Sequence, residues 1–293
     1  MNAYLAELTA IGGRIEALAK QKMIEEIEAM PAPAGPDGRP NMLGHWIGQQ
    51  VMKSQLPDLK WVTSTLVEYG MVHGKALDGQ DAVADLEAAR KALADFKSPI
   101  GFSEGVIRSI QKTLSSWEEG AGKDFESFYL YQLPYHSRVQ QDIMEATHSA
   151  FDSYAELYRH VREIGLEVAR KTEETLAKLD PRAVVAGAFA KGFLEVLGIS
   201  LEVAGIFAPK GVDKGVALSK VVVTQAGKAV AGIQLGGDRV AGILESMSAG
   251  LKSAGEHANQ VHQDLDKVFG KSHEAAEIVF DDAIPSYPPF TGR

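Results

Sequence analysis

The longest regular pattern of inward-facing positions in the chain spans residues 139–179. The steps between these positions are only three and four residues, which keeps side chains on one face of an α-helix. One amphipathic helix cannot bury such a stripe, so we expect a partner helix. We take six of the positions as the helix interface: Val139, Ile143, Leu157, Val161, Ile164 and Val168.

Shorter helices are predicted before this stripe, over residues 2–30, 43–56, 59–72 and 81–96, with Asp81 as an N-cap. The Pro- and Gly-rich residues 31–40 predict a solvated loop. We expect Ser98-Pro99 to end the fourth helix and a fifth helix to cover 102–116. After a turn at Trp117–Gly120 the chain becomes helical again, and Pro134 is expected to kink or restart the long helix.

Residues 181–255 are rich in Gly and Ala, and we expect two or three closely packed helices there, followed by a helix over 240–269. The predicted segments are 1–80, 81–180, 181–280 and an extended tail, 281–293. The predicted fold class is all-α: an elongated bundle built on a long antiparallel helical hairpin, with a bend at Trp117 and Gly120.

Composition excludes several classes of function. The chain has 293 residues, a formal charge of −9 and no cysteine. The negative charge argues against non-specific binding of nucleic acid, and the lack of cysteine excludes disulfides and thiol catalysis. The N-terminus has neither a basic region nor an uninterrupted apolar run, so we expect no Sec signal peptide.

We expect no enzyme activity, no cofactor and no metal site, because no nucleotide-binding, zinc-protease or hydrolase motif occurs in a suitable context. Two pairs of potential metal ligands were considered, His257 with His262 and His273 with Glu277. The first pair is turned by about 140° on a helix and the second offers only two ligands. Both are interpreted as solvated helix residues.

The bend at Trp117, with Gly120, Phe125 and Phe128, resembles that of WXG-type substrates of actinobacterial type VII (ESX) secretion. The stretches 140–143 and 169–176 also resemble this family, and larger PE/PPE-like members share the helical organisation. The resemblance implies a protein exported without a signal peptide, acting as an effector or assembly unit through a helical partner or a second copy. It also implies contact with the secretion machinery.

The chain departs from the family pattern at two points. Two glutamates separate Trp117 from Gly120, whereas a literal Trp-x-Gly occurs at Trp46-Ile47-Gly48 after the Pro/Gly loop. No tyrosine has an acidic residue four positions on, although the family's export signal has one. A partner, or a region beyond Arg293, would then carry the signal.

The apolar segment 183–208 leaves two interpretations open. One is a buried helical hairpin. The other is a concealed membrane-active hairpin of an α-helical pore-forming toxin component, with candidate residues Phe189, Phe193, Leu197, Ile199, Leu201, Ile206 and Phe207. Lys191, Glu195 and Glu202 interrupt the segment, so we expect no resident transmembrane span. A third hypothesis makes the chain the delivery domain of a longer toxin.

Overall fold

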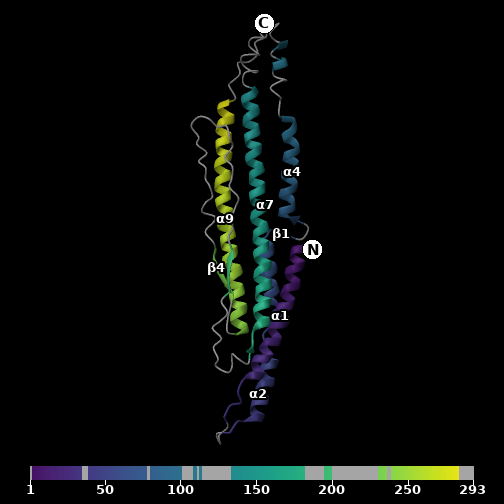
Figure 1. Cartoon of the computed structure of the whole chain (residues 1–293), viewed down its shortest axis with the longest axis vertical. Coiled ribbons are helices and arrows are strands. Elements are labelled where there is room, and N and C mark those ends of the chain that lie inside the picture. Colours follow the sequence, from purple (N-terminus) through teal and green to yellow (C-terminus); the bar gives the residue numbers. More distant parts are fainter. Residues whose placement is uncertain are drawn as a thin grey trace. The chain divides into compact units, whose positions relative to one another are not determined.

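The computed structural model describes residues 2–34, 39–77, 80–100, 108–110, 112–113, 133–181, 195–199, 230–235 and 239–283. Helices dominate this part of the chain, which confirms the all-α prediction (Figure 1). The chain divides into two compact units, and each draws on three separate stretches. The first comprises Met1–Ala82, Leu157–Glu202 and Ala226–Val261, and the second comprises Val83–Glu156, Val203–Gln225 and His262–Arg293.

The core of the first unit is formed by α1 (Ala3–Ala29), α3 (Lys60–Val72) and parts of α7 (Leu133–Lys178) and α9 (Val240–Ala283). All four carry apolar side chains at helical spacing, and these side chains are buried. The most deeply buried large ones are Leu8, Ile11, Ile15, Leu66, Leu157, Leu176, Ile243, Leu244 and Met247.

Contacts between α1 and its neighbours fix the helix directions. Gly12 lies against Thr63 and Gly70 against Leu5, so α3 runs antiparallel to α1. Arg170 pairs with Glu7, and Arg14 pairs with Glu173 farther along both helices, so α7 runs parallel to α1.

The first unit is completed by α9, which begins beside the last turns of α1. The Val240 amide donates to the Glu26 carboxylate at 3.0 Å, and Gly255 lies against His73, just beyond α3. α9 therefore runs antiparallel to α1 and α7. In chain order, α1, α3, α7 and α9 alternate in direction, as in an up-and-down bundle.

Three smaller features belong to the same unit. The α2 helix (Met42–Ser54) follows the loop after α1. Strands β1 (Ala76–Leu77) and β2 (Gln80–Asp81) pair antiparallel directly after α3. Strands β3 (Glu195–Ile199) and β4 (Val230–Leu235) also pair antiparallel, with Leu197 opposite Ile233 and a register irregularity before Ile199.

The second unit contains α4 (Ala82–Ile100), residues 133–156 of α7 and residues 262–283 of α9. Arg90 donates to Asp152 at 2.7 Å, which joins α4 to α7. The Tyr154 hydroxyl donates to the Asp266 carboxylate, and the Tyr154 ring lies 5.2 Å from that of His262. Tyr154 thus connects α7 to α9 through both polar and aromatic contacts.

Three predictions about secondary structure are wrong. Within residues 181–255, where we expected only helices, β3 and β4 occupy 195–199 and 230–235, and their Val and Ile residues suit strands. The last helix does not end near residue 269, because α9 continues to Ala283. Helix α4 does not end before Pro99 but continues to Ile100. A proline in the last turn removes a single backbone donor there, which the end of a helix tolerates.

The long helix is present as predicted. α7 begins at Leu133, with Pro134 in its first turn, where a backbone N–H has no helical partner to lose. The predicted bend at 117–120 lies outside the described residues, so the hairpin around it stays a prediction. Over residues 157–176, the partners of the α7 stripe are helices of the first unit.

Candidate interaction surface on α2

The predicted interface residues of α7 fall into two groups. Leu157, Val161, Ile164 and Val168 lie in the core of the first unit, where they are 4% exposed or less. Ile143 is half-buried in the second unit, and Val139 lies on α7 as well. Side chains buried so deeply inside one unit pack the chain against itself. They leave no free face there for a second protein.

The other predicted site residues are mostly beyond the part of the chain that the structure describes. Leu197 and Ile199 of the predicted membrane-active segment lie on β3. The residues outside the description are Trp117, Gly120, Phe125, Phe128, Phe189, Phe193, Leu201, Ile206 and Phe207.

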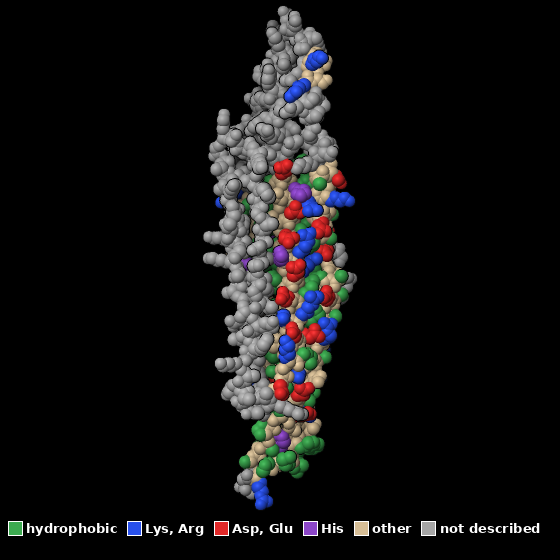
Figure 2. Space-filling view, in the orientation of Figure 1, with side chains coloured by type: hydrophobic (Ala, Val, Ile, Leu, Met, Phe, Trp, Pro, Cys, Tyr) green, Lys and Arg blue, Asp and Glu red, His purple; other side chains and the backbone are tan. Residues whose placement is uncertain are grey.

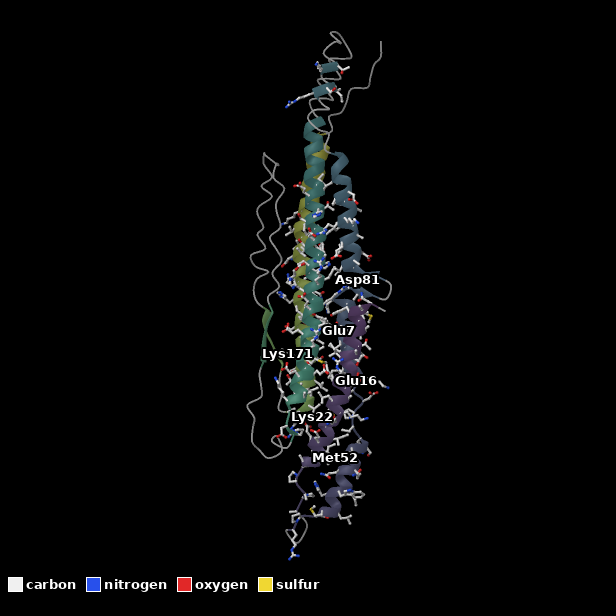
Figure 3. The ribbon with its side chains drawn as sticks, turned by 45° about the vertical axis from the view of Figure 1, so that its right-hand side comes forward. Glu7, Glu16, Lys22, Met52, Asp81 and Lys171 are labelled. Carbon is white, nitrogen blue, oxygen red and sulfur yellow. The ribbon has the colours of Figure 1, made fainter. Side chains whose placement is uncertain are left out.

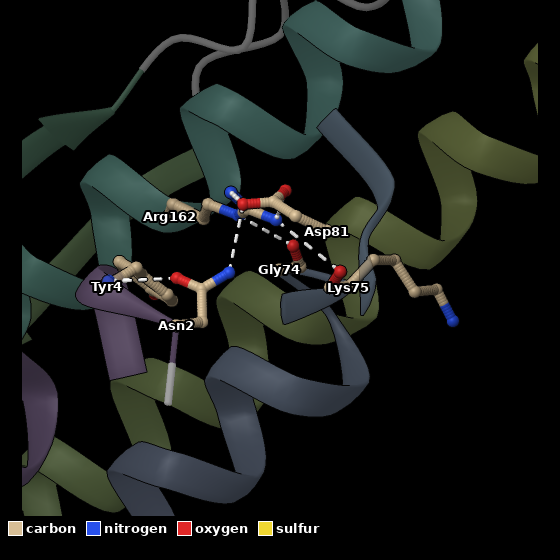
Figure 4. Close-up of polar contacts among 6 residues, drawn as sticks. All are labelled: Asn2, Tyr4, Gly74, Lys75, Asp81 and Arg162. Carbon is tan, nitrogen blue, oxygen red and sulfur yellow. Dashed lines mark hydrogen bonds and ion pairs between the residues drawn. The ribbon is translucent and has the colours of Figure 1, made fainter. Parts of the chain in front are cut away.

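Figure 4 shows a polar cluster around Arg162 of α7, which the sequence did not reveal. The guanidinium donates to both carboxylate oxygens of Asp81, at 2.7 and 3.2 Å, and to the Gly74 carbonyl at 2.8 Å. Asn2 also donates to Asp81, at 2.9 Å. The cluster joins the start of α1, the turn after α3, β2 and α7. Because its charges are paired with one another, we interpret it as a structural clamp.

Two tyrosines adjoin this clamp, Tyr69, which is buried, and Tyr4, which is half-buried. The Tyr69 hydroxyl donates to the Val161 carbonyl at 3.2 Å, and the Arg162 guanidinium lies over the Tyr4 ring at 5.6 Å. Burial raises the pKa of both phenols above the ordinary value of 10. Neither is therefore suited to act as a base near neutral pH, and both serve packing.

Two half-buried histidines meet at α9: His257 is part of this helix, and His73 lies against its Gly255. Nδ1 of His73 and Nε2 of His257 are buried and have no hydrogen-bond partner within the described chain. Burial lowers the pKa of both side chains, although a hydrogen bond between His73 and Asn259 opposes this effect at His73. Both side chains are thus expected to be neutral in the folded protein at pH 7.

Helix α2 presents its polar face to the rest of the protein. His45, Gln49 and Lys53 recur every four residues and are half-buried. The Gln49 amide donates to the carbonyls of Ile27 and Glu28 at the end of α1, at 2.9 and 3.2 Å. Lys53 forms a 2.6 Å ion pair with the Glu28 carboxylate. The Gln49 bonds reach two carbonyls in the last turn of α1, where i+4 donors run out, and the Ile27 carbonyl also accepts from the Met30 amide.

Most of the apolar side chains of α2 are exposed, and the exposed Gln50 lies among them. The exposed fractions are 68% for Met42, 71% for Leu43, 58% for Trp46, 49% for Ile47 and 48% for Val51. We call these five side chains the α2 apolar face. Figure 2 shows hydrophobic side chains gathered over α2, and none of the helix's residues is buried. This is the reverse of the usual arrangement, in which an amphipathic helix turns its apolar stripe inward.

Local sequence explains why α2 forms although it contributes nothing to the core. The Asn41 side chain accepts from the Gly44 amide at 2.9 Å and caps the helix, while the Asn41 amide donates to the Pro33 carbonyl. Lys53 in the last turn complements the helix dipole. In Figure 3, Met52 marks the end of α2, and Lys22 and Glu16 mark α1.

The sequence predicted this helix but not the direction of its faces. An amphipathic spacing shows that the two faces differ, and it does not show which one points inward. The spacing of His45, Gln49 and Lys53 was the available signal. The literal Trp46-Ile47-Gly48 lies within α2 and not at a bend between helices.

Other kinds of site were sought in the described part of the chain. It holds no group of three or more His, Asp or Glu side chains placed to bind a metal ion. None of its helices combines the length and the hydropathy that crossing a bilayer requires. Comparison with protein-family models, curated proteins and solved structures finds no match to this chain.

Proposed function

We propose that this chain is a non-enzymatic docking protein, a helical bundle that binds an apolar partner surface through α2. The observation that supports this is the inverted orientation of α2, with polar residues against α1 and the α2 apolar face in solvent. Exposed apolar surface is unfavourable in water, and a contiguous patch of this kind is typical of an interaction site. No catalytic role is proposed for any residue.

A neutral apolar dye such as Nile red tests whether the α2 apolar face is available for binding. We expect strong fluorescence with the wild-type chain and a loss of more than half of it in the double variant Leu43→Gln/Ile47→Gln. The matched control is Met71→Gln, which removes an exposed side chain of α3 and should leave the signal unchanged. Equal dye binding by all three proteins would contradict the proposal.

Two predictions from the sequence add possible contexts for such docking. Export as a type VII substrate rests on the resemblance at residues 117–128, 140–143 and 169–176, and pore formation rests on segment 183–208. Both stay predictions, because the bend at 117–128 and most of segment 183–208 lie outside the described residues.

A further inference from the structure

We propose that the α2 apolar face docks onto the surface of a lipid bilayer that contains anionic lipids. This inference rests on the proposed function and names the partner. It concerns α2 and its flanking loop, a region separate from the apolar segment 183–208.

The charge around α2 fits an anionic surface. Residues 39–57 contain no Asp or Glu, although the whole chain has 39 acidic against 30 basic residues. Among the basic residues of this stretch, Lys53 is paired with Glu28, so the exposed Arg39 is the main positive charge that it offers. An anionic headgroup layer repels carboxylates and attracts Lys and Arg, so this part of an acidic protein approaches such a layer most easily.

The length of α2 determines how it would lie on a bilayer. Its 13 residues span about 20 Å at 1.5 Å per residue, which is shorter than the roughly 30 Å hydrocarbon core. A helix of this length with one apolar face lies in the plane of the interface and does not cross it. Trp46 then places its indole near the headgroups, where tryptophan is favoured.

The form of the α2 apolar face suits a fluid surface. Its five side chains are 48–71% exposed and project from one short helix. A fluid bilayer accepts such a surface, since its lipids rearrange around the side chains and no matching shape is needed.

Sedimentation of the full chain with lipid vesicles tests this inference. We expect the wild-type chain to bind phosphatidylcholine vesicles that contain phosphatidylglycerol, and to bind pure phosphatidylcholine about tenfold more weakly. Leu43→Gln/Ile47→Gln should weaken binding to the anionic vesicles by at least about tenfold, whereas Met71→Gln should not. Arg39→Gln should weaken it by a few-fold, and added salt should do the same. Circular dichroism shows whether each variant keeps its helix content.

The outcomes separate this inference from the proposed function. Absence of binding to anionic vesicles, or equal binding by the Leu43→Gln/Ile47→Gln variant, would overturn the bilayer inference. If Nile red binding still depended on Leu43 and Ile47, the proposed docking face would stand with another occupant. A dimer that depends on α2, found by analytical ultracentrifugation without vesicle binding, would identify a second copy. If neither dye nor vesicles distinguished the variants, both proposals would fail.

Discussion

At the scale of single residues, two adjacent glycines of α1 have opposite environments. A methyl group on Gly12 would lie 2.6 Å from the Thr63 hydroxyl oxygen and 2.9 Å from the Thr63 Cα. A methyl group on Gly13 would meet nothing within 4 Å. Gly12 therefore permits the close approach of α1 and α3, while Gly13 only weakens the helix.

These environments predict stability changes of opposite sign. Gly12→Ala should lower the free energy of unfolding by about 1–3 kcal/mol, because the Thr63 backbone has to move away. Gly13→Ala should raise it by about 0.5–1 kcal/mol, the difference in helix propensity between Gly and Ala. Urea unfolding of the two variants beside the wild type measures both. A change of the same sign in both would show that Thr63 does not restrict Gly12.

At the scale of elements, two arginines of α7 occupy different settings. Arg162 is 13% exposed and bonds to Asp81 and to the Gly74 carbonyl. Arg170 is 61% exposed and pairs with Glu7, which is 44% exposed. Burial and multiple donors make the first contact important for holding α7 to its neighbours, and exposure makes the second contact weak.

Replacing each arginine by methionine should reveal this difference. Arg162→Met should lower the free energy of unfolding by about 2–4 kcal/mol, because it leaves a partly buried carboxylate and a carbonyl without their main donor. Arg170→Met should cost less than about 1 kcal/mol. Urea or thermal unfolding provides the measurement. Similar losses in both variants would contradict the role assigned to the Arg162 clamp.

Helical spacing was sufficient to predict α1, α3, α7 and α9, since each contributes a stripe to a core. The predicted start of the last helix at residue 240 agrees with α9. The pairing of Leu197 with Ile233 could not be predicted, because strands so far apart in the chain leave no local pattern. Of the candidate surface, the helix could be predicted from the sequence but the direction of its faces could not. The helix over 43–56 was expected, but the inward direction of Gln49 depends on the end of α1.

At the scale of the whole molecule, the two half-buried histidines, His73 and His257, make the free energy of unfolding depend on pH. Burial holds the pKa of His73 and of His257 below the ordinary value of 6.5. The unfolded chain therefore binds more protons than the folded chain as pH falls through this value. The two neutral side chains therefore make their full contribution to the free energy of unfolding above pH 6.5. This contribution is lost as the pH falls from 6.5 through the lowered pKa of the folded protein.

We therefore expect the free energy of unfolding to decrease as pH falls from above 7 toward 5.5, measured by urea unfolding at fixed ionic strength. The double variant His73→Gln/His257→Gln should show a shallower dependence over this range. Hydrogen bonds from Lys178 and Lys171 lower the pKa of Glu174 below 4.5, so this carboxylate contributes to acid sensitivity only at lower pH. An unchanged slope in the double variant would exclude the two histidines as its source.

The way α2 is attached has a further consequence for the molecule. The hydrogen bonds from Gln49 and the ion pair of Lys53 involve groups that water can solvate equally well if the helix departs. No side chain of α2 is buried in the core formed by α1, α3, α7 and α9, so this core stays intact when these contacts break. The stability of this core thus depends little on α2, so the helix that we propose for docking could change its orientation while the bundle stays folded.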